Sequence, residues 1–199
     1  MILQKLLENV PIILGSQSPR RKELLKSLDL EFDIQVKETD ESFDDNENPI
    51  HIVEYIASQK LKAFNDIAYW DKLVICADTI VVDQQGKVLG KPKDLKEAKG
   101  VISQLANKEH LVYTAVAFSF QGKVASFVEG TKVWFSNLND EEIAYYVDNY
   151  KPLDKAGSYG IQEWIGRVAI EKIEGSYENV IGLPTARLYQ ELKGFLSKK

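Results

Sequence analysis

KLVICADTIVV, residues 72–82, is the stretch that decides the fold class of this chain. It is too rich in β-branched residues for a helix, and we expect it to form a central strand of a sheet. Asp78 interrupts this apolar run, and a carboxylate in a buried strand is costly unless it is paired, hydrogen-bonded or metal-bound. The stretch therefore predicts a strand that carries either a structural aspartate or a functional one, acting as a general base or a metal ligand.

Helical and strand patterns alternate on both sides of this stretch, which indicates an α/β fold. Before it we predict strands at 11–16 and 31–36, helices at 19–28 and 49–69, and a loop over 38–49. After it we predict helices at 94–105, 139–150 and 184–196, and strands at 111–120, 123–136 and 166–173. A hairpin at 121–123 makes the sheet mixed. We expect one domain, residues 1–199, with a mixed twisted sheet flanked by helices.

The composition is that of a folded, acidic protein. The 199 residues are 44% hydrophobic and 28% charged, with a net charge of −5, which argues against a nucleic-acid binder. The single cysteine, Cys76, excludes an intrachain disulfide, and its apolar surroundings predict a buried, inert thiol. No membrane span or secretory signal is evident in the sequence, so we expect a cytoplasmic protein.

The turn after the first predicted strand has the chemistry of an anion site. It reads SQSPRR, residues 16–21, and leads from a strand into a helix, with Ser18 expected at the N-cap and Pro19 at the first helical position. The first N–H groups of a helix have no partner within it, and the helix dipole adds partial positive charge there. Ser16 and Ser18 add hydroxyls, and Arg20 and Arg21 add planar donors that suit phosphate oxygens. The alternative is a capped helix that carries two solvated arginines.

Five short motifs occur in a specific order along the chain: SQSPRR, ADT, LGKP, DKAGSYGIQ and GSYENVIGLP. Each motif alone is weak, but the ordered set is highly specific. On these motifs the chain resembles the Maf family of nucleoside-triphosphate pyrophosphatases, from its first strand to its last helix. The resemblance implies a Maf/ITPase-like fold with two lobes around a cleft, usually as a homodimer. It also implies hydrolysis of a nucleoside triphosphate to the monophosphate and pyrophosphate.

The resemblance also assigns roles to residues at matching motif positions. Asp78 matches the proton acceptor, and Glu41 together with Asp78 matches the carboxylates of a divalent metal site, for Mg²⁺ or Mn²⁺. The phosphate-binding positions are matched by Ser16, Arg20, Arg21, Lys60 and Lys91, and the positions that separate base classes by Arg20, Thr79 and Gln162. Lys62 competes with Lys60 for its role. Judged alone, Glu41 and Lys91 have the pattern of solvated surface charges.

ADT combined with GIQ resembles the members of the family that act on dTTP and UTP. The Gln162 amide offers both an N–H and a C=O, which match the edge of a uracil or thymine ring. The chain departs from the family pattern directly after Gln162, where Glu163 and Trp164 replace the usual glycine. We expect these two side chains to affect the base pocket, and Trp164 to be placed for stacking on a base.

Other functions stay open at this stage. One alternative is a pyrophosphatase for a different base, such as 7-methyl-GTP. Another is a regulator of division or septum formation that acts through a protein partner, with helix 139–150 and its Tyr145, Tyr146 and Tyr150 as the surface. We interpret these aromatic residues mainly as packing. His51 and His110 are expected to be structural or exposed, because the chemistry above needs neither of them.

Overall fold

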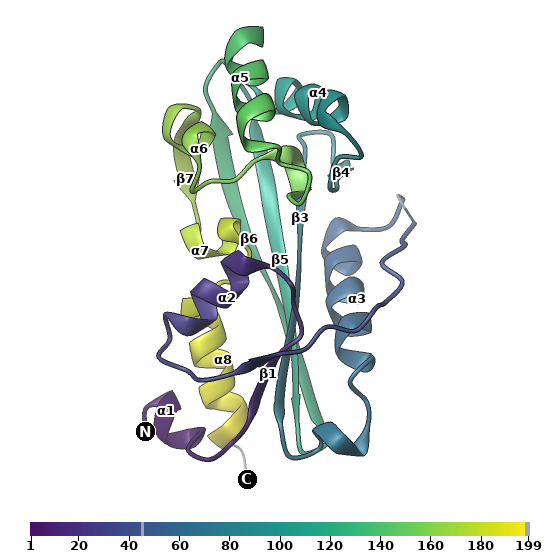
Figure 1. Cartoon of the computed structure of the whole chain (residues 1–199), viewed down its shortest axis with the longest axis vertical. Helices are drawn as coiled ribbons and strands as arrows, with labels where there is room; N and C mark the ends of the chain where they lie inside the picture. The colour runs from purple at the N-terminus through teal and green to yellow at the C-terminus, as the bar shows by residue number, and fades with distance from the viewer. Residues whose placement is uncertain (45, 198–199) are drawn as a thin grey trace. The chain divides into compact units, whose positions relative to one another are not determined.

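The computed structural model describes residues 1–44 and 46–197, and within them a seven-stranded mixed sheet is flanked by helices (Figure 1). Six strands follow the order β2-β1-β3-β5-β6-β7, and β4 pairs with β3. β1 is parallel to β2 and β3, while β4 is antiparallel to β3 and β7 is antiparallel to β6. The predicted α/β class and the mixed sheet are therefore confirmed.

The strands are β1 (Ile12–Leu14), β2 (Asp33–Ile34), β3 (Leu73–Val82), β4 (Val88–Leu89), β5 (Glu109–Phe120), β6 (Lys123–Phe135) and β7 (Ile170–Glu174). The helices are α1 (Leu3–Leu6), α2 (Pro19–Lys26), α3 (Pro49–Lys62), α4 (Leu95–Leu105), α5 (Asp140–Tyr150), α6 (Trp164–Val168), α7 (Tyr177–Ile181) and α8 (Thr185–Ser197). Two 3₁₀ turns are η1 (Ile67–Tyr69) and η2 (Ala156–Ser158). No helix in the described part of the chain is long and apolar enough to cross a membrane.

The chain divides into two compact units. The first contains Met1–Asp78, Thr114–Glu129 and Gly182–Lys199, and the second contains Thr79–Tyr113 and Gly130–Ile181. The boundaries fall within long strands, so that β3, β5 and β6 each contribute residues to both units. Asp78 is consequently the last residue of the first unit on β3, and Thr79 is the first residue of the second.

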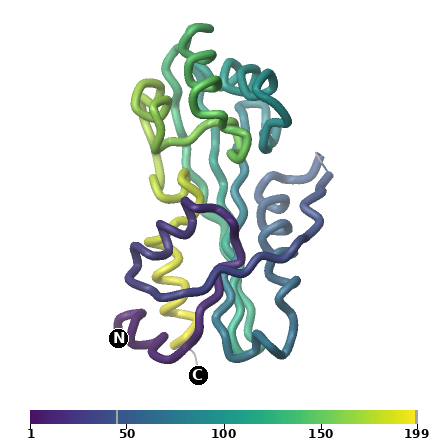
Figure 2. Tube along the Cα trace, in the orientation of Figure 1, coloured from purple at the N-terminus to yellow at the C-terminus, as the bar shows by residue number. Residues whose placement is uncertain are grey.

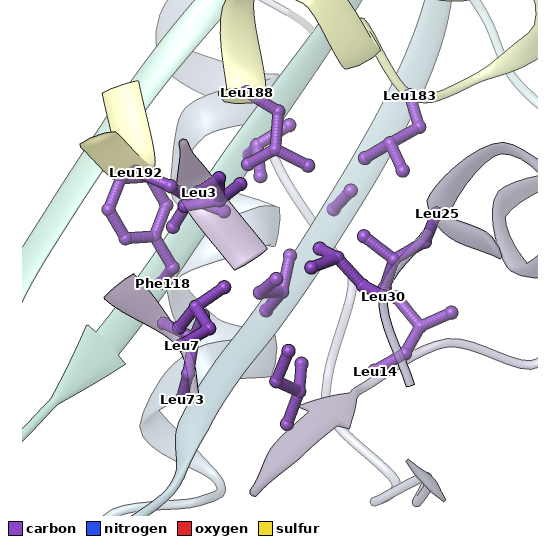
Figure 3. Packing of buried hydrophobic residues seen from close by; sticks show 14 of the residues in the cluster. Leu3, Leu7, Leu14, Leu25, Leu30, Leu73, Phe118, Leu183, Leu188 and Leu192 are labelled. Atoms are coloured by element: carbon purple, nitrogen blue, oxygen red, sulfur yellow. The ribbon is translucent and has the colours of Figure 1, made fainter. Parts of the chain in front are cut away.

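The core of the first unit is built where three helices cover one face of its strands. Leucines of α1, α2 and α8 pack onto buried residues of β1, β3 and β5 (Figure 3). In Figure 1, these helices lie on one side of the strands of this unit and α3 lies on the other. The first and last helices of the chain, α1 and α8, are in contact, and Figure 2 shows the two segments side by side. This packing fixes the ends of β1 and β3, which carry candidate site residues.

The second unit packs α4 against α5 and η2. A capping box starts α5, because the Asn139 side chain accepts from the Glu142 N–H and the Glu142 carboxylate accepts from the Asn139 N–H. Tyr146 of α5 is fully buried and stacks on Tyr150, which is 38% exposed, while Tyr145 is 50% exposed. The expectation that these aromatic residues serve mainly in packing is met in full only at Tyr146.

Three predicted elements differ from the structure. The helix expected over 49–69 ends at Lys62, because the Asp66 side chain accepts from the Ala68 N–H and begins η1 instead. The strand expected over 166–173 starts only at Ile170, because the preceding residues form α6. The strand expected over 31–36 is reduced to two residues. Within the predicted loop 38–49, residue 45 lies outside the described residues.

His110 lies in β5 of the second unit and gives a prediction about stability. Its side chain is buried, with Nε2 2.8 Å from the Tyr159 hydroxyl, and burial lowers its pKa from 6.5 to about 4. As the pH falls, the unfolded chain takes up the proton first, so the free energy of unfolding decreases between about pH 6.5 and pH 4. We expect His110 to account for a loss of about 2 kcal/mol between pH 7 and pH 5.

Urea unfolding of the wild type and of His110→Gln at both pH values measures this loss. The pH-dependent loss should be smaller in His110→Gln by that amount, whereas the exposed His51, changed to Gln, should leave it as in the wild type. Equal losses in the wild type and in His110→Gln contradict the prediction.

Candidate active site

The turn between β1 and α2 forms one side of the candidate site. Gly15 is required there, since a Cβ at this position would lie 2.5 Å from Cys76 Sγ. Ser18 caps α2 by accepting from the Arg21 N–H, and Pro19 occupies the first position of the helix, as predicted. The Ser16 hydroxyl oxygen accepts from the Ser18 N–H at 3.2 Å. The turn is therefore tightly folded against β3, and Ser16 is buried within it.

Arg21 is tied into this turn by its side chain. Nη1 donates to Ser16 Oγ at 3.3 Å, and Nε donates to the carbonyl oxygen of Gly182 at 2.8 Å. Burial lowers the pKa of Arg21, while the nearby carboxylates of Asp78 and Glu41 act in the opposite direction. Arg21 is thus a half-buried, oriented guanidinium next to two carboxylates, and the alternative of a solvated arginine is wrong for it.

Lys60 of α3 joins the two carboxylates. Its Nζ lies 2.6 Å from Asp78 Oδ1 and 2.9 Å from Glu41 Oε1. The side chains of Lys60 and Asp78 are only 16% and 14% exposed, whereas that of Glu41 is 47% exposed. Lys62 is exposed on the same helix. The geometry therefore places Lys60, and not Lys62, with the candidate catalytic residues.

Asp78 is thus a paired carboxylate in a strand whose preceding residues are all buried. Its neighbour Cys76 is buried, as predicted, and burial raises the pKa of the thiol to about 12. The thiol stays protonated near neutral pH and is not a nucleophile. The reactive group that this strand offers to the site is the Asp78 carboxylate.

The second unit contains the other predicted residues, Thr79, Lys91 and Gln162. Lys91 and Gln162 are exposed, and Thr79 is half-buried. The Gly157 N–H donates to the Gly90 carbonyl at 3.3 Å, so that the LGKP segment is bonded to the loop that leads to Gln162. Within this unit the structure therefore links two of the predicted motifs, LGKP and DKAGSYGIQ.

The two departures after Gln162 have partners of their own in the second unit. Trp164 packs edge-on against Tyr145, with ring centroids 5.0 Å apart. The Glu163 carboxylate accepts from the Tyr146 hydroxyl and pairs with Lys155 at 3.1 Å. Lys155 had no predicted role, and its only signal in the sequence is its place in the DKAGSYGIQ motif.

The chemistry of the carboxylate pair fits a magnesium-type ion. In the described residues there is no cluster of three or more His, Cys, Asp or Glu side chains that would enclose a metal. Glu41 and Asp78 nevertheless converge on one ammonium group. Mg²⁺ is commonly bound through one or two carboxylates, with water and substrate phosphates as the remaining ligands. Two converging carboxylates beside a cationic turn therefore suit a metal that arrives with a phosphate substrate.

The structure is that of an α/β protein in which an oriented arginine at the β1–α2 turn lies near a lysine paired with two carboxylates. The chain belongs to the Maf-like protein family, whose profile matches residues 11–195. The dTTP/UTP pyrophosphatase of Flavobacterium psychrophilum is 46% identical over 188 residues, covering 94% of this chain and 96% of that protein. The protein of the same name from Christiangramia forsetii is 44% identical over 196 residues, covering 98% and 100%.

A more distant likeness is to the solved structure of a nucleoside-triphosphatase, the dITP/XTP pyrophosphatase of Mycobacterium abscessus. The TM-score is 0.47 and the sequences are 11% identical, over 94% of this chain and 98% of the other.

Proposed function

We propose that this protein hydrolyses dTTP and UTP to the corresponding monophosphate and pyrophosphate. The observation that carries the proposal is the Lys60 ammonium between Asp78 and Glu41, next to the oriented Arg21 guanidinium. This arrangement supplies cationic side chains that can bind a triphosphate, and it also supplies a carboxylate that can accept a proton from a water molecule. Membership of the Maf-like family, and relatives at 44–46% identity that are named dTTP/UTP pyrophosphatases, support the same activity.

The cationic side chains would bind the phosphates. Arg20, Arg21, Lys60 and Lys91 would provide four positive charges, and Ser16 would provide a hydroxyl. Charge-assisted hydrogen bonds to phosphate oxygens are stronger than neutral ones, and an arginine can bind two oxygens at once. Because most catalysis of phosphoryl transfer comes from positioning and charge neutralisation, these groups are expected to provide much of the rate enhancement.

Asp78 is proposed as the proton acceptor. Its carboxylate, held by Lys60 at 2.6 Å, would take a proton from the water that attacks the phosphorus. The Lys60 ammonium keeps this carboxylate oriented until substrate binds. Glu41, which is more exposed, would then be able to turn toward the triphosphate.

Glu41 and Asp78 would hold the divalent ion, Mg²⁺ or Mn²⁺. When bound, such an ion neutralises charge on the phosphates and polarises the scissile anhydride. Lys60, which contacts both carboxylates in the structure, would then be available to bind phosphate oxygens of the substrate.

Thr79 and Gln162, together with Arg20, are proposed to select the base. A side-chain amide can donate to and accept from the edge of a uracil or thymine ring. A site built on such hydrogen bonds rejects bases that would leave its polar groups unpaired. Gln162 is exposed at the tip of a loop in the second unit, which leaves its amide accessible to a ligand.

We further propose that the chain acts as a single domain and as a cytoplasmic homodimer. The family profile spans both compact units, which supports the single domain. The dimer rests on the family resemblance, and the location on the expectation drawn from the sequence. Light scattering at several protein concentrations measures the oligomeric state.

The test of the proposed activity is pyrophosphate release from dTTP, UTP, CTP, ATP, GTP and 7-methyl-GTP, with Mg²⁺, with Mn²⁺ and with a chelator. We expect kcat/KM for dTTP and UTP to exceed that of the purine nucleotides by more than about tenfold, and activity to disappear with the chelator. A tenfold preference for 7-methyl-GTP or another purine nucleotide overturns the base assignment. The absence of pyrophosphate release from every nucleotide overturns the activity itself.

A further inference from the structure

The turn that carries Gln162 is held at both ends by one hydroxyl group. The Glu163 N–H donates to the Gly160 carbonyl at 3.0 Å, which places Ile161 and Gln162 at the centre of a four-residue turn. The hydroxyl of Tyr146, on α5, accepts from the Gly160 N–H at 3.0 Å and donates to Glu163 Oε2. The first and the last residue of the turn are therefore bonded to the same atom of a fully buried side chain.

An ion pair also holds Glu163, the last residue of the turn, through its other carboxylate oxygen. Lys155 Nζ lies 3.1 Å from Glu163 Oε1 and 2.8 Å from Asp154 Oδ1. The Lys155 side chain is only 10% exposed, and a buried ammonium is tolerated only with such partners. Gly160 leaves the room for this arrangement, since a Cβ there would lie 2.7 Å from the Glu163 carboxylate. Burial raises the pKa of Tyr146, so its hydroxyl remains a donor.

These contacts fix the backbone of the turn and leave the Gln162 side chain exposed to solvent. Tyr159, Gly160 and Ile161 are buried, while Gln162 is exposed. An amide has a donor end and an acceptor end, so it discriminates between bases only when the backbone beneath it is fixed. Fixing that backbone before the ligand binds also avoids an entropic cost on binding.

We propose that Tyr146, Glu163 and Lys155 are positioning residues that fix the Gln162 turn and thereby set the preference for uracil and thymine over cytosine. Together they form a clamp between α5 and the turn; from the sequence, Tyr146 was expected to serve in packing and Glu163 to affect the base pocket, and Lys155 had no predicted role. This inference rests on the proposed function, in which Gln162 contacts the base.

The test compares UTP with CTP, whose bases differ in the donors and acceptors at the edge to which the Gln162 amide would hydrogen-bond. Tyr146→Phe removes the hydroxyl and keeps the ring. We expect the UTP/CTP ratio of kcat/KM to fall by about fivefold or more, through a higher KM for UTP with a nearly unchanged kcat. Tyr145→Phe makes the same chemical change one residue earlier on α5, at a half-exposed ring outside the clamp, and should leave the ratio unchanged. Thermal unfolding of each variant reports whether it is folded.

A second comparison separates positioning from a purely structural role. If the clamp acts through Gln162, Tyr146→Phe changes the UTP/CTP ratio by less than about twofold once Gln162→Ala is present. Equal effects of Tyr146→Phe with and without Gln162 overturn the inference, and so does an unchanged ratio in Tyr146→Phe alone. If Tyr146→Phe does not fold, Glu163→Gln, which removes the charge at a more exposed position, takes its place in both comparisons.

The failure of this inference differs from the failure of the proposed function. A wild-type protein that releases no pyrophosphate from dTTP or UTP overturns the activity and the inference together. An active wild-type protein whose UTP/CTP ratio survives Gln162→Ala overturns the inference and the base-selecting role of Gln162, while the pyrophosphatase activity stands.

Discussion

Replacing Asp78 with asparagine is expected to lower kcat/KM for dTTP and UTP by about 10²- to 10⁴-fold, the range of a lost general base. Asparagine has nearly the same shape, and its side-chain oxygen can still accept from Lys60, whose Nζ lies 2.6 Å from the carboxylate in the wild type. The amide cannot take a proton from water and is a poorer metal ligand. The loss should therefore appear mainly in kcat, with a folded protein.

A matched control is Asp83→Asn, which makes the same substitution directly after β3. Asp83 is buried and accepts from the N–H groups of Gln85 and Lys87, each at 2.9 Å. Its replacement should lower the melting temperature and leave the activity per folded molecule close to that of the wild type. If Asp78→Asn folds normally and retains more than about a third of the activity, Asp78 is a structural residue and the proposed mechanism is wrong.

Local patterns in the sequence were sufficient to predict β3, the cap of α2 and the hairpin between β5 and β6, because each depends on nearby residues. The helix that replaces the start of the last predicted strand was missed for a different reason. A Cβ at Gly166 would lie 1.9 Å from the Ile161 carbonyl oxygen, so this part of the chain folds back on its own preceding turn. Such a contact depends on tertiary packing, and no hydrophobic periodicity in the sequence signals it.

The candidate site shows the same limit. The anion site proposed at the β1–α2 turn could be inferred from the residue types of SQSPRR. Glu41, in contrast, has the pattern of a solvated loop residue, and only the structure shows Lys60 of α3 at 2.9 Å from it. The motif match favoured Lys60 over its competitor Lys62, but position on the helix does not separate them, because both lie in the last turn of α3. Only the direction of each side chain separates them. For Glu163, the sequence singled out the residue as a departure from the family pattern, but it gave no indication that Tyr146 would be its hydrogen-bond partner.

Replacing Lys60 with methionine is expected to impair both activity and stability. Loss of one or two charge-assisted hydrogen bonds to the triphosphate should lower kcat/KM by about 10- to 100-fold. The variant also leaves the Asp78 carboxylate, only 14% exposed, without its ammonium partner. Removing one member of a largely buried ion pair costs about 3 kcal/mol of unfolding free energy. Lys62→Met, on the exposed side of the same helix, should change stability by less than about 0.5 kcal/mol and leave kcat/KM nearly unchanged.

The double variant Lys60→Met/Asp78→Asn separates the two losses. Asparagine removes the unpaired charge, so we expect the double variant to be more stable than Lys60→Met alone, by about 1–2 kcal/mol, although it remains inactive. Glu41→Gln should give less recovery in the same background, because its side chain is 47% exposed and its pairing is screened by water. Chemical denaturation of the wild type, Lys60→Met, Asp78→Asn and the double variant measures the coupling between Lys60 and Asp78. If the losses of stability are strictly additive, the Lys60–Asp78 pair contributes nothing to the stability of the fold. If Lys62→Met loses more activity than Lys60→Met, the phosphate-binding role belongs to Lys62.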